Sequence, residues 1–439
     1  MKPSMEKRAD QDSPETSCFL LAVLALSLLA FCVRMIGLST LSMSGDSSYS
    51  VYSANLGLAR SFAERIYDGH PLLYYYLLHF WTLISGNSEL STRFLSVFWG
   101  VLTVPLGVVI GRRLGGKEVG LLAALFITVS PGLVFYSRMI RMYSLVTFLA
   151  LLSLYLFWRA IRGGRLYWVA YFLITLAALY AHYYTVSLVA AQAVFFLIWL
   201  WRRQDRSNLL PWLGTQFALA LLFLPWLAYA GPTQVEKTAW IISHAPAPDD
   251  LRGFLEQVWI SFNIGVTLDI DVARPLSLLI VPLVLTGLFS WWQSRARPSP
   301  FLLLSLAATA IPILLSYMLF LGMPYAVRPR FLMIYLPIYL ALLAGLVVGW
   351  RRFHKVLFLL VLAFVLTSQV YALMDAYYVE RNTLEPSSIM LVERLDRYAQ
   401  SGDAVVFHAH WQIGYFKSHY RGEPVTTYTL DEVKSIPPP

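Results

Sequence analysis

One carboxylate, Asp46, lies among small hydroxyl residues in the stretch "LSTLSMSGDSSYSVYSA", residues 38–54, directly after an apolar run. A carboxylate next to a reacting hydroxyl group can act as a general base. Aspartate is also a frequent N-cap, and the residues after Asp46 are typical of a helix, so a structural role is open as well.

Arginines gather in two later segments, "YSRMIRMYS" and "MPYAVRPR", which contain Arg138, Arg141, Arg328 and Arg330. A guanidinium group stays charged and binds phosphate oxygens in a bidentate manner. We therefore expect Arg141 to contact a phosphate, with Arg138 and Arg330 in support. The alternative is that these arginines only anchor the protein at lipid headgroups.

Histidine and tyrosine side chains add a third set of candidates. His70 precedes Pro71 in "DGHPLLYYY", which also contains Tyr74 and Tyr75, and His182 and Tyr183 end an apolar run. We predict that these five residues line a substrate site. The competing interpretations are a histidine that caps a surface helix and an aromatic belt at the membrane interface.

Other polar residues carry weaker signals. His408 and His410 alternate in a predicted strand, but no third ligand is evident, so we predict no metal there. The segment 231–274 has the length of a functional loop, and acceptor contacts are unassigned among its polar residues Glu236, Lys237, His244, Asp269 and Asp271.

The elements that must position these residues are transmembrane helices. The chain has 439 residues, of which 58% are hydrophobic and 13% charged, so it is a polytopic membrane protein. The net charge of +9 does not indicate nucleic-acid binding, because the basic residues lie in short loops between apolar runs and set the topology. The apolar run from 18 extends to about Leu38 and further spans follow, so we prefer an uncleaved anchor to a secretory signal.

Eleven apolar runs have membrane-spanning length. They cover about residues 18–38, 90–111, 118–136, 142–160, 166–183, 185–201, 210–230, 275–292, 301–321, 331–350 and 355–375. Residues 71–88 are apolar but short, and we predict an interfacial helix there with Tyr and Trp at headgroup depth. This assignment puts the basic loops in the cytoplasm, as the positive-inside rule requires.

The predicted fold is therefore an all-α polytopic membrane protein with a small α/β module at its C-terminus. Residues 1–17 form a cytoplasmic tail, residues 18–375 the transmembrane domain, and residues 376–439 the extracytoplasmic module. The first outer loop covers 39–89 and the long outer loop 231–274. Within the module we expect an amphipathic helix, a Gly-Asp turn and the strand "AVVFHA".

The motifs "GDSSYSVYSA", "DGHPLLYYYLLHF" and "SPGLVFYSRMIRMYSLVTF" resemble the polyprenyl-phosphate-sugar-dependent glycosyltransferases of the C superfamily. That superfamily includes protein O-mannosyltransferases and the transferase that puts aminoarabinose on lipid A. The resemblance covers about residues 18–200 and returns at "RPRFLMIYLPIYLALLAGL". It implies a membrane enzyme whose active site opens on the outer face, with a lipid-phosphate-linked sugar as donor and Asp46 as catalytic base.

The chain departs from this family at two acids. The family has Glu after the first aspartate, where this chain has Ser47, and an acid at the position of Met139; Arg141 is retained. A divalent cation held between two acidic loops is therefore in doubt, and we assign no metal ligands. Arg138, where the family more often has Gln, would compensate for a lost metal.

Sugar transfer to a hydroxyl needs a base for that hydroxyl and positive charge for the departing phosphate. We predict an inverting transferase that moves a hexose or pentose from a polyprenyl phosphate to a protein, lipid or glycan hydroxyl at the cell membrane. A non-enzymatic lipid or solute transporter is the alternative, and a structural protein that recruits partners through its tail is a third.

Overall fold

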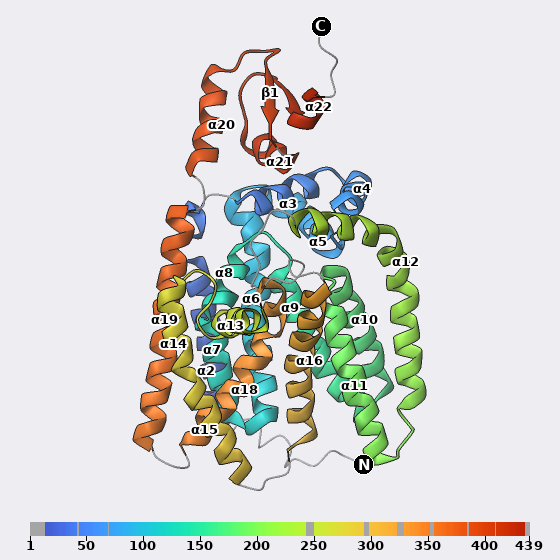
Figure 1. Ribbon diagram of the computed structural model, residues 1–439, viewed down its shortest axis with the longest axis vertical. Helices are drawn as coiled ribbons and strands as arrows, with labels where there is room; N and C mark the ends of the chain where they lie inside the picture. Colours follow the sequence, from blue (N-terminus) through green and yellow to red (C-terminus); the bar gives the residue numbers. More distant parts are fainter. Residues whose placement is uncertain are drawn as a thin grey trace.

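The computed structural model describes residues 14–41, 44–68, 70–242, 250–293, 298–322, 329–351, 355–383, 386–408 and 410–434. Long helices form one bundle, and a small module lies beyond one end of it (Figure 1). We call this end, which also carries α3 (Gly45–Asn55), α4 (Leu58–Asp68) and α5 (Leu73–Ser85), the upper end. The opposite, lower end contains the turns from α6 to α7 and from α11 to α12.

The bundle is built from apolar helices, because a helix satisfies its own backbone groups where no water is available. They are α2 (Pro14–Met35), α6 (Glu89–Gly115), α7 (Lys117–Val129), α8 (Pro131–Arg138), α9 (Tyr143–Ile161), α10 (Arg165–Ala181), α11 (Thr185–Arg203), α12 (Leu209–Ile242), α14 (Ile270–Leu278), α15 (Ile280–Gln293), α16 (Pro300–Gly322), α18 (Leu336–Trp350) and α19 (Lys355–Thr383). In the described part of the chain, nine helical stretches are long and apolar enough to cross a membrane.

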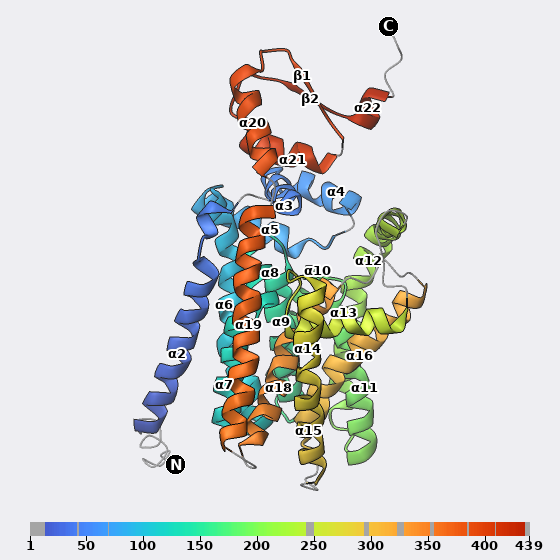
Figure 2. The same cartoon turned by 60° about the vertical axis from the view of Figure 1, so that its left-hand side comes forward.

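Each of the eleven expected spans coincides with one of these helical stretches. Besides the nine, α7 and α8 together form a tenth, bent candidate, and α10 is apolar but has only 17 residues. The chain is thus a multi-pass, all-α membrane protein, as predicted. Figure 2 shows α2 rising from the lower end, and α22 lies beyond the upper end.

The expected span 118–136 is broken in the structure. α7 ends at Val129 and α8 begins at Pro131, and the two helices meet at an angle of 53°. Proline is tolerated at the first position of a helix, where its missing N–H has no intrahelical partner. The break redirects the chain, so that α8 delivers the turn 139–142 into the protein interior, where Ile140 is fully buried.

At the upper end, α3, α4 and α5 lie across the tops of the spanning helices (Figures 1 and 2). With 13 residues α5 is about 20 Å long, too short to cross a bilayer. Tyr74 and Tyr75 are completely buried, so these two tyrosines face the protein rather than the lipid headgroups that we expected.

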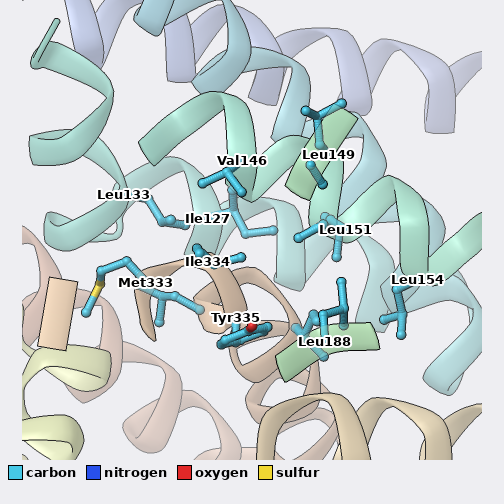
Figure 3. Close-up of a cluster of buried hydrophobic side chains, with 14 of the residues drawn as sticks. Ile127, Leu133, Val146, Leu149, Leu151, Leu154, Leu188, Met333, Ile334 and Tyr335 are labelled. Atoms are coloured by element: carbon cyan, nitrogen blue, oxygen red, sulfur yellow. The ribbon is translucent and has the colours of Figure 1, made fainter. Parts of the chain in front are cut away.

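The core below the upper end joins helices that are distant in sequence (Figure 3). It contains Ile127, Leu133, Val146, Leu149, Leu151, Leu154, Leu188 and the short 3-10 helix η3 (Met333–Tyr335). The Tyr335 hydroxyl lies 2.6 Å from Ser187 Oγ and donates to the Tyr184 carbonyl at 2.7 Å. Because η3 directly follows α17 (Pro329–Leu332), this core also holds the backbone of Arg330 in place.

The C-terminal module consists of α20 (Pro386–Tyr398), β1 (Ala404–Phe407), α21 (His410–His419), β2 (Thr426–Thr429) and α22 (Leu430–Lys434). The two strands pair in parallel, with Ala404 opposite Thr426. β1 ends at Phe407 and His410 opens α21, so His408 and His410 do not share one face of a strand as predicted.

The module packs on α3 through α21. A Cβ atom at Gly414 would come within 3.1 Å of Tyr52 Cβ and 3.4 Å of the Tyr49 backbone, which is tighter than ordinary van der Waals contact. A glycine therefore allows α21 to approach the helix that carries Asp46.

Candidate functional site

Asp46 lies in the first turn of α3 but is not the residue that caps this helix. Ser44 is the N-cap, and its Oγ accepts from the Ser47 backbone N–H at 3.4 Å. The Asp46 side chain is 47% exposed. The capping interpretation of Asp46 is therefore replaced by a carboxylate that projects from a helix capped by its neighbour.

Ser47 connects α3 to the turn that carries the arginines. Its Oγ accepts from the Ile140 backbone N–H at 3.2 Å and lies 3.1 Å from Ser44 Oγ. The hydroxyl that stands at the position of the family's second acid thus has a structural role here. The bond joins Ser47 to Ile140 across 93 residues of sequence, and so links the neighbours of Asp46 and Arg141.

Arg141 lies beside Asp46, with Nε 4.0 Å from Asp46 Oδ2. Its guanidinium donates to the Tyr75 hydroxyl at 3.3 Å, and a second nitrogen lies 3.3 Å from His70 Nε2. Because a guanidinium has only donors, His70 Nε2 must be the acceptor in this pair. Two residues that the sequence singled out, His70 and Tyr75, therefore meet at Arg141, which lies beside Asp46.

Tyr74 supports the backbone of Arg141 through Ser96. The Tyr74 hydroxyl lies 2.7 Å from Ser96 Oγ, and Ser96 Oγ donates to the Arg141 carbonyl at 3.3 Å. Burial raises the pKa of Tyr74, so this hydroxyl keeps its proton. We conclude that Tyr74 positions the arginine turn and does not contact a substrate.

Arg330 reaches the same carboxylate from a third segment. Its Nη1 lies 3.9 Å from Asp46 Oδ2, and its side chain is 30% exposed. Asp46, Arg141 and Arg330, which we call the charged triplet, combine one negative and two positive charges. Both distances are longer than a hydrogen bond. Since the two positive charges exceed the single negative charge, the charged triplet attracts an additional anion at this end of the protein.

His182 borders the charged triplet directly after α10. Its Nδ1 accepts from the Tyr184 N–H at 3.2 Å, and its ring packs 5.3 Å from the Phe331 ring. Burial lowers the pKa of His182 to about 3, and the nearby charges of Arg141 and Arg330 contribute to the shift. The imidazole is therefore neutral at physiological pH and presents Nε2–H as a donor.

This pKa predicts an acid sensitivity. Between pH 6.5 and about 3, the unfolded state binds a proton at His182 that the folded state excludes, so folding stability falls as the pH falls through this window. We expect acidification from about pH 7 to about pH 4.5 to lower the melting temperature of the wild type more than that of His182→Asn. Equal losses in both proteins, measured by thermal unfolding in detergent, would contradict the lowered pKa.

Arg138 is not part of the charged triplet. Its Nε donates to Glu380 Oε2 at 2.8 Å, and Nη1 donates to the carbonyls of Arg34 and Ile36 at 3.1 and 2.6 Å. The side chains of both partners in the ion pair are almost completely buried. This network ties α8 to α2 and α19, so Arg138 is a structural residue instead of the phosphate ligand that we expected.

The buried pair leads to a stability prediction. Removing one partner leaves an uncompensated buried charge, at a cost of about 3–5 kcal/mol. Glu380→Ala should therefore unfold at a much lower temperature than the wild type, whereas Arg138→Met combined with Glu380→Leu should recover most of the loss. If Glu380→Ala melts like the wild type, the pair does not hold α8 and α19 together.

The remaining sequence candidates lie elsewhere. Tyr183 accepts from Trp226 Nε1 at 3.1 Å and packs in a separate apolar cluster between α10 and α12. Asp269 caps α14, since it accepts from the Asp271 N–H at 2.8 Å. Arg328 and His244 lie outside the described residues, as do the side chains of Glu236 and Lys237.

The residues around Asp46 do not fit a divalent metal. Ser47 uses its hydroxyl to hold the turn, and Met139 has no oxygen ligand in its side chain. In the described part of the chain, Asp46 lies beside two guanidinium groups, which repel a cation. Among the described residues, no group of three or more His, Cys, Asp or Glu is placed to hold a metal ion.

Several residues of the site were missed by sequence reasoning. Ser47 and Ser96 act through hydrogen bonds that no motif reveals, and Phe331 packs on His182 only because η3 folds into the core. Glu380 did leave a signal in the sequence, because it is an acid close after the last apolar run. A buried arginine such as Arg138 needs an acidic partner of this kind.

Comparisons with known proteins agree with this architecture. Residues 69–229 match the family model described as dolichyl-phosphate-mannose-protein mannosyltransferase. A curated relative, an uncharacterized protein from Aquifex aeolicus strain VF5, is 28% identical over 169 residues, which cover 37% of this chain. The match covers only 34% of that protein's length.

Two solved structures share the fold. ArnT from Cupriavidus metallidurans, crystallised with undecaprenyl phosphate, is 13% identical and superposes with a TM-score of 0.53, covering 92% of this chain and 85% of its own. The oligosaccharyltransferase AglB from Archaeoglobus fulgidus, solved with an inhibitory peptide and a dolichol phosphate, is 13% identical with a TM-score of 0.51, covering 93% and 65%. The chain has the fold of the C-superfamily glycosyltransferases. The resemblance that the motifs indicated is thereby confirmed for the fold, and the charged triplet occupies the upper end of this C-superfamily fold.

Proposed function

We propose that the chain is an inverting glycosyltransferase that moves a sugar from a polyprenyl-phosphate donor to a hydroxyl acceptor at the upper end, which we place outside the cytoplasm. The observation that carries this proposal is the charged triplet. A half-exposed carboxylate lies within about 4 Å of two guanidinium groups that arrive from separate segments. Transfer from a phosphate to a hydroxyl requires this combination of base and cations.

In the proposed reaction the acceptor hydroxyl gives its proton to Asp46 while its oxygen bonds to the anomeric carbon. The bond between that carbon and the donor phosphate oxygen breaks, and its electron pair leaves with the polyprenyl phosphate. Arg141 and Arg330 bind the phosphate and stabilise the charge that it gains. A single displacement of this kind inverts the anomeric centre.

Donor binding would also prepare the base. In the structure both arginines face Asp46, whose carboxylate therefore competes with a phosphate for the same two cations. The donor phosphate is a diester with one negative charge, like the carboxylate, but its two free oxygens can bind the guanidinium groups in a bidentate manner. Asp46 is then available to the acceptor hydroxyl, while Tyr75 and His70 keep Arg141 in place. The released polyprenyl phosphate gains a second charge, which the two arginines stabilise.

The positions of the buried charges support a glycosyltransferase better than the transporter alternative. Among the described residues, the buried Arg and Glu side chains are Arg34, Arg93, Arg138, Arg141 and Glu380. All of them lie in the upper portion of their helices or in the turn at that end. Transport pathways place ionisable groups midway through the membrane, whereas this pattern suits chemistry at one face.

The proposal is tested with the full chain in lipid vesicles, a panel of radiolabelled polyprenyl-phosphate sugars and a crude envelope fraction as acceptor. We expect label to leave one donor, and the freed lipid to be the polyprenyl phosphate. The inverting step predicts that the new glycosidic bond has the opposite anomeric configuration to the donor. If no donor is consumed while labelled lipid crosses the vesicle membrane, the chain is a transporter instead.

A further inference from the structure

A second charged site lies at the lower end, far from Asp46. A cavity of about 480 Å³ opens between the C-terminal ends of α6, α9 and α11 and the start of α16. We call it the lower cavity, and its lining includes Arg112, Arg113, Arg162, Arg203, Trp158 and Trp199. The 19 residues of α9 lie between the lower cavity and the turn that carries Arg141, which is a length of about 28 Å along the helix.

In the part of the chain that the structure describes, no acid lines the lower cavity. None of its four arginines takes part in a salt bridge among the described residues. Asp205, which follows Arg203 closely in sequence, is solvent-exposed, and its carboxylate accepts from the Ser207 N–H. Four like charges around one hollow repel each other, and an anion placed between them would remove that repulsion.

The two tryptophans hold arginines over their ring faces. The Arg162 guanidinium carbon lies 5.4 Å from the Trp158 ring centre, and that of Arg203 lies 5.3 Å from the Trp199 ring centre. A cation over an aromatic face leaves its in-plane N–H donors for another partner. These donors suit the oxygens of a phosphate, which accept two parallel hydrogen bonds.

Trp158 contributes its ring to the lower cavity. The residue is only 5% exposed, and its Nε1–H is buried and inaccessible from the cavity. The indole therefore supports Arg162 through its ring face and does not donate to an anion in the cavity.

We propose that the lower cavity binds a phosphate-bearing anion whose oxygens accept from Arg162 and Arg203. The source is either the headgroup of an anionic phospholipid or a soluble phosphate compound. The apolar surfaces of Trp199 and Phe301 beside the arginines favour the lipid. This site is separate from the charged triplet, so the proposal does not depend on sugar transfer.

The test measures binding to the full-length protein in phosphatidylcholine nanodiscs, with phosphatidylglycerol titrated in one arm and inorganic phosphate or pyrophosphate in the other. We expect Arg162→Gln with Arg203→Gln to weaken binding of the phosphate group about tenfold or more, because each lost bond involves a charged donor. Arg165→Gln with Arg206→Gln removes the same charge outside the cavity lining and should bind like the wild type.

The two arms separate the sources. Saturation by phosphatidylglycerol without competition from pyrophosphate identifies a lipid headgroup, whereas competition by pyrophosphate identifies a soluble phosphate compound. Binding that is equal in the cavity variant and in the matched control variant would overturn the proposal. The proposal also fails if neither phosphatidylglycerol nor the free phosphates bind in preference to phosphatidylcholine.

Discussion

Asp46→Asn is expected to slow sugar transfer about 10²–10⁴-fold, the usual contribution of a general base. The amide keeps the size of the carboxylate but cannot take the acceptor proton. It also removes the negative charge that faces Arg141 and Arg330, so the variant should bind polyprenyl phosphate at least as tightly as the wild type. Loss of transfer without loss of phosphate binding would distinguish a base from a structural residue.

Two controls accompany Asp46→Asn. Asp269→Asn exchanges the same groups at the N-cap of α14, where asparagine caps equally well, and should leave transfer unchanged. Asp46→Glu retains a carboxylate at a shifted position and should keep part of the activity. Should Asp46→Asn transfer sugar at the wild-type rate, Asp46 is not the base, whatever the activity of the chain.

Arg141→Gln is expected to have the second largest effect, a loss of about 10²–10³-fold in transfer together with weaker donor binding. The guanidinium is 5% exposed and is held by Tyr75 and His70, so it is already oriented when a phosphate binds. Arg330→Gln should cost less, because the Arg330 side chain is more exposed and better screened.

Arg141→Lys and Arg60→Gln provide the comparison for Arg141. Lysine keeps the charge but loses bidentate binding, so Arg141→Lys should recover only part of the activity. Arg60 is exposed on α4 at the same end of the protein, and Arg60→Gln removes a charge outside the triplet. If Arg141→Gln and Arg60→Gln lower transfer equally, the effect is one of general surface charge and not of phosphate binding.

Much of the architecture follows from the sequence, because membrane spans carry their own signal. The eleven runs coincide with the helical stretches of the bundle. The break at Ser130 was not predicted, although Pro131 marks it, because the hydropathy of residues 118–136 is continuous. The orientation of Tyr74 and Tyr75 also escaped prediction, since an aromatic residue suits both a headgroup region and a protein core.

The candidate site was partly accessible from sequence. Asp46, His70, Arg141 and Arg330 were singled out by residue type, and the structure brings all four together. Arg138 and Arg141 could not be separated in advance, because both stand in one short turn. Only the position of Glu380, 242 residues away, shows that Arg138 is neutralised inside the bundle while Arg141 faces Asp46.

The docking of the C-terminal module was beyond sequence reasoning. One helix and one strand were predicted from their patterns, but β2 and α21 were not, and the contact of α21 with α3 depends on Gly414, which has no local signature. This contact puts the module directly on the helix of Asp46. Deletion of the module should therefore affect the position of α3 as well as any role in recruiting partners.

The most direct measurement is a single-turnover assay that follows donor binding and sugar release separately in the wild type, Asp46→Asn and Arg141→Gln. Our account predicts that Asp46→Asn binds the donor but releases no polyprenyl phosphate on the timescale of the wild type, and that Arg141→Gln binds the donor weakly. Normal release by Asp46→Asn together with normal donor binding by Arg141→Gln would show that the charged triplet is not the site of transfer.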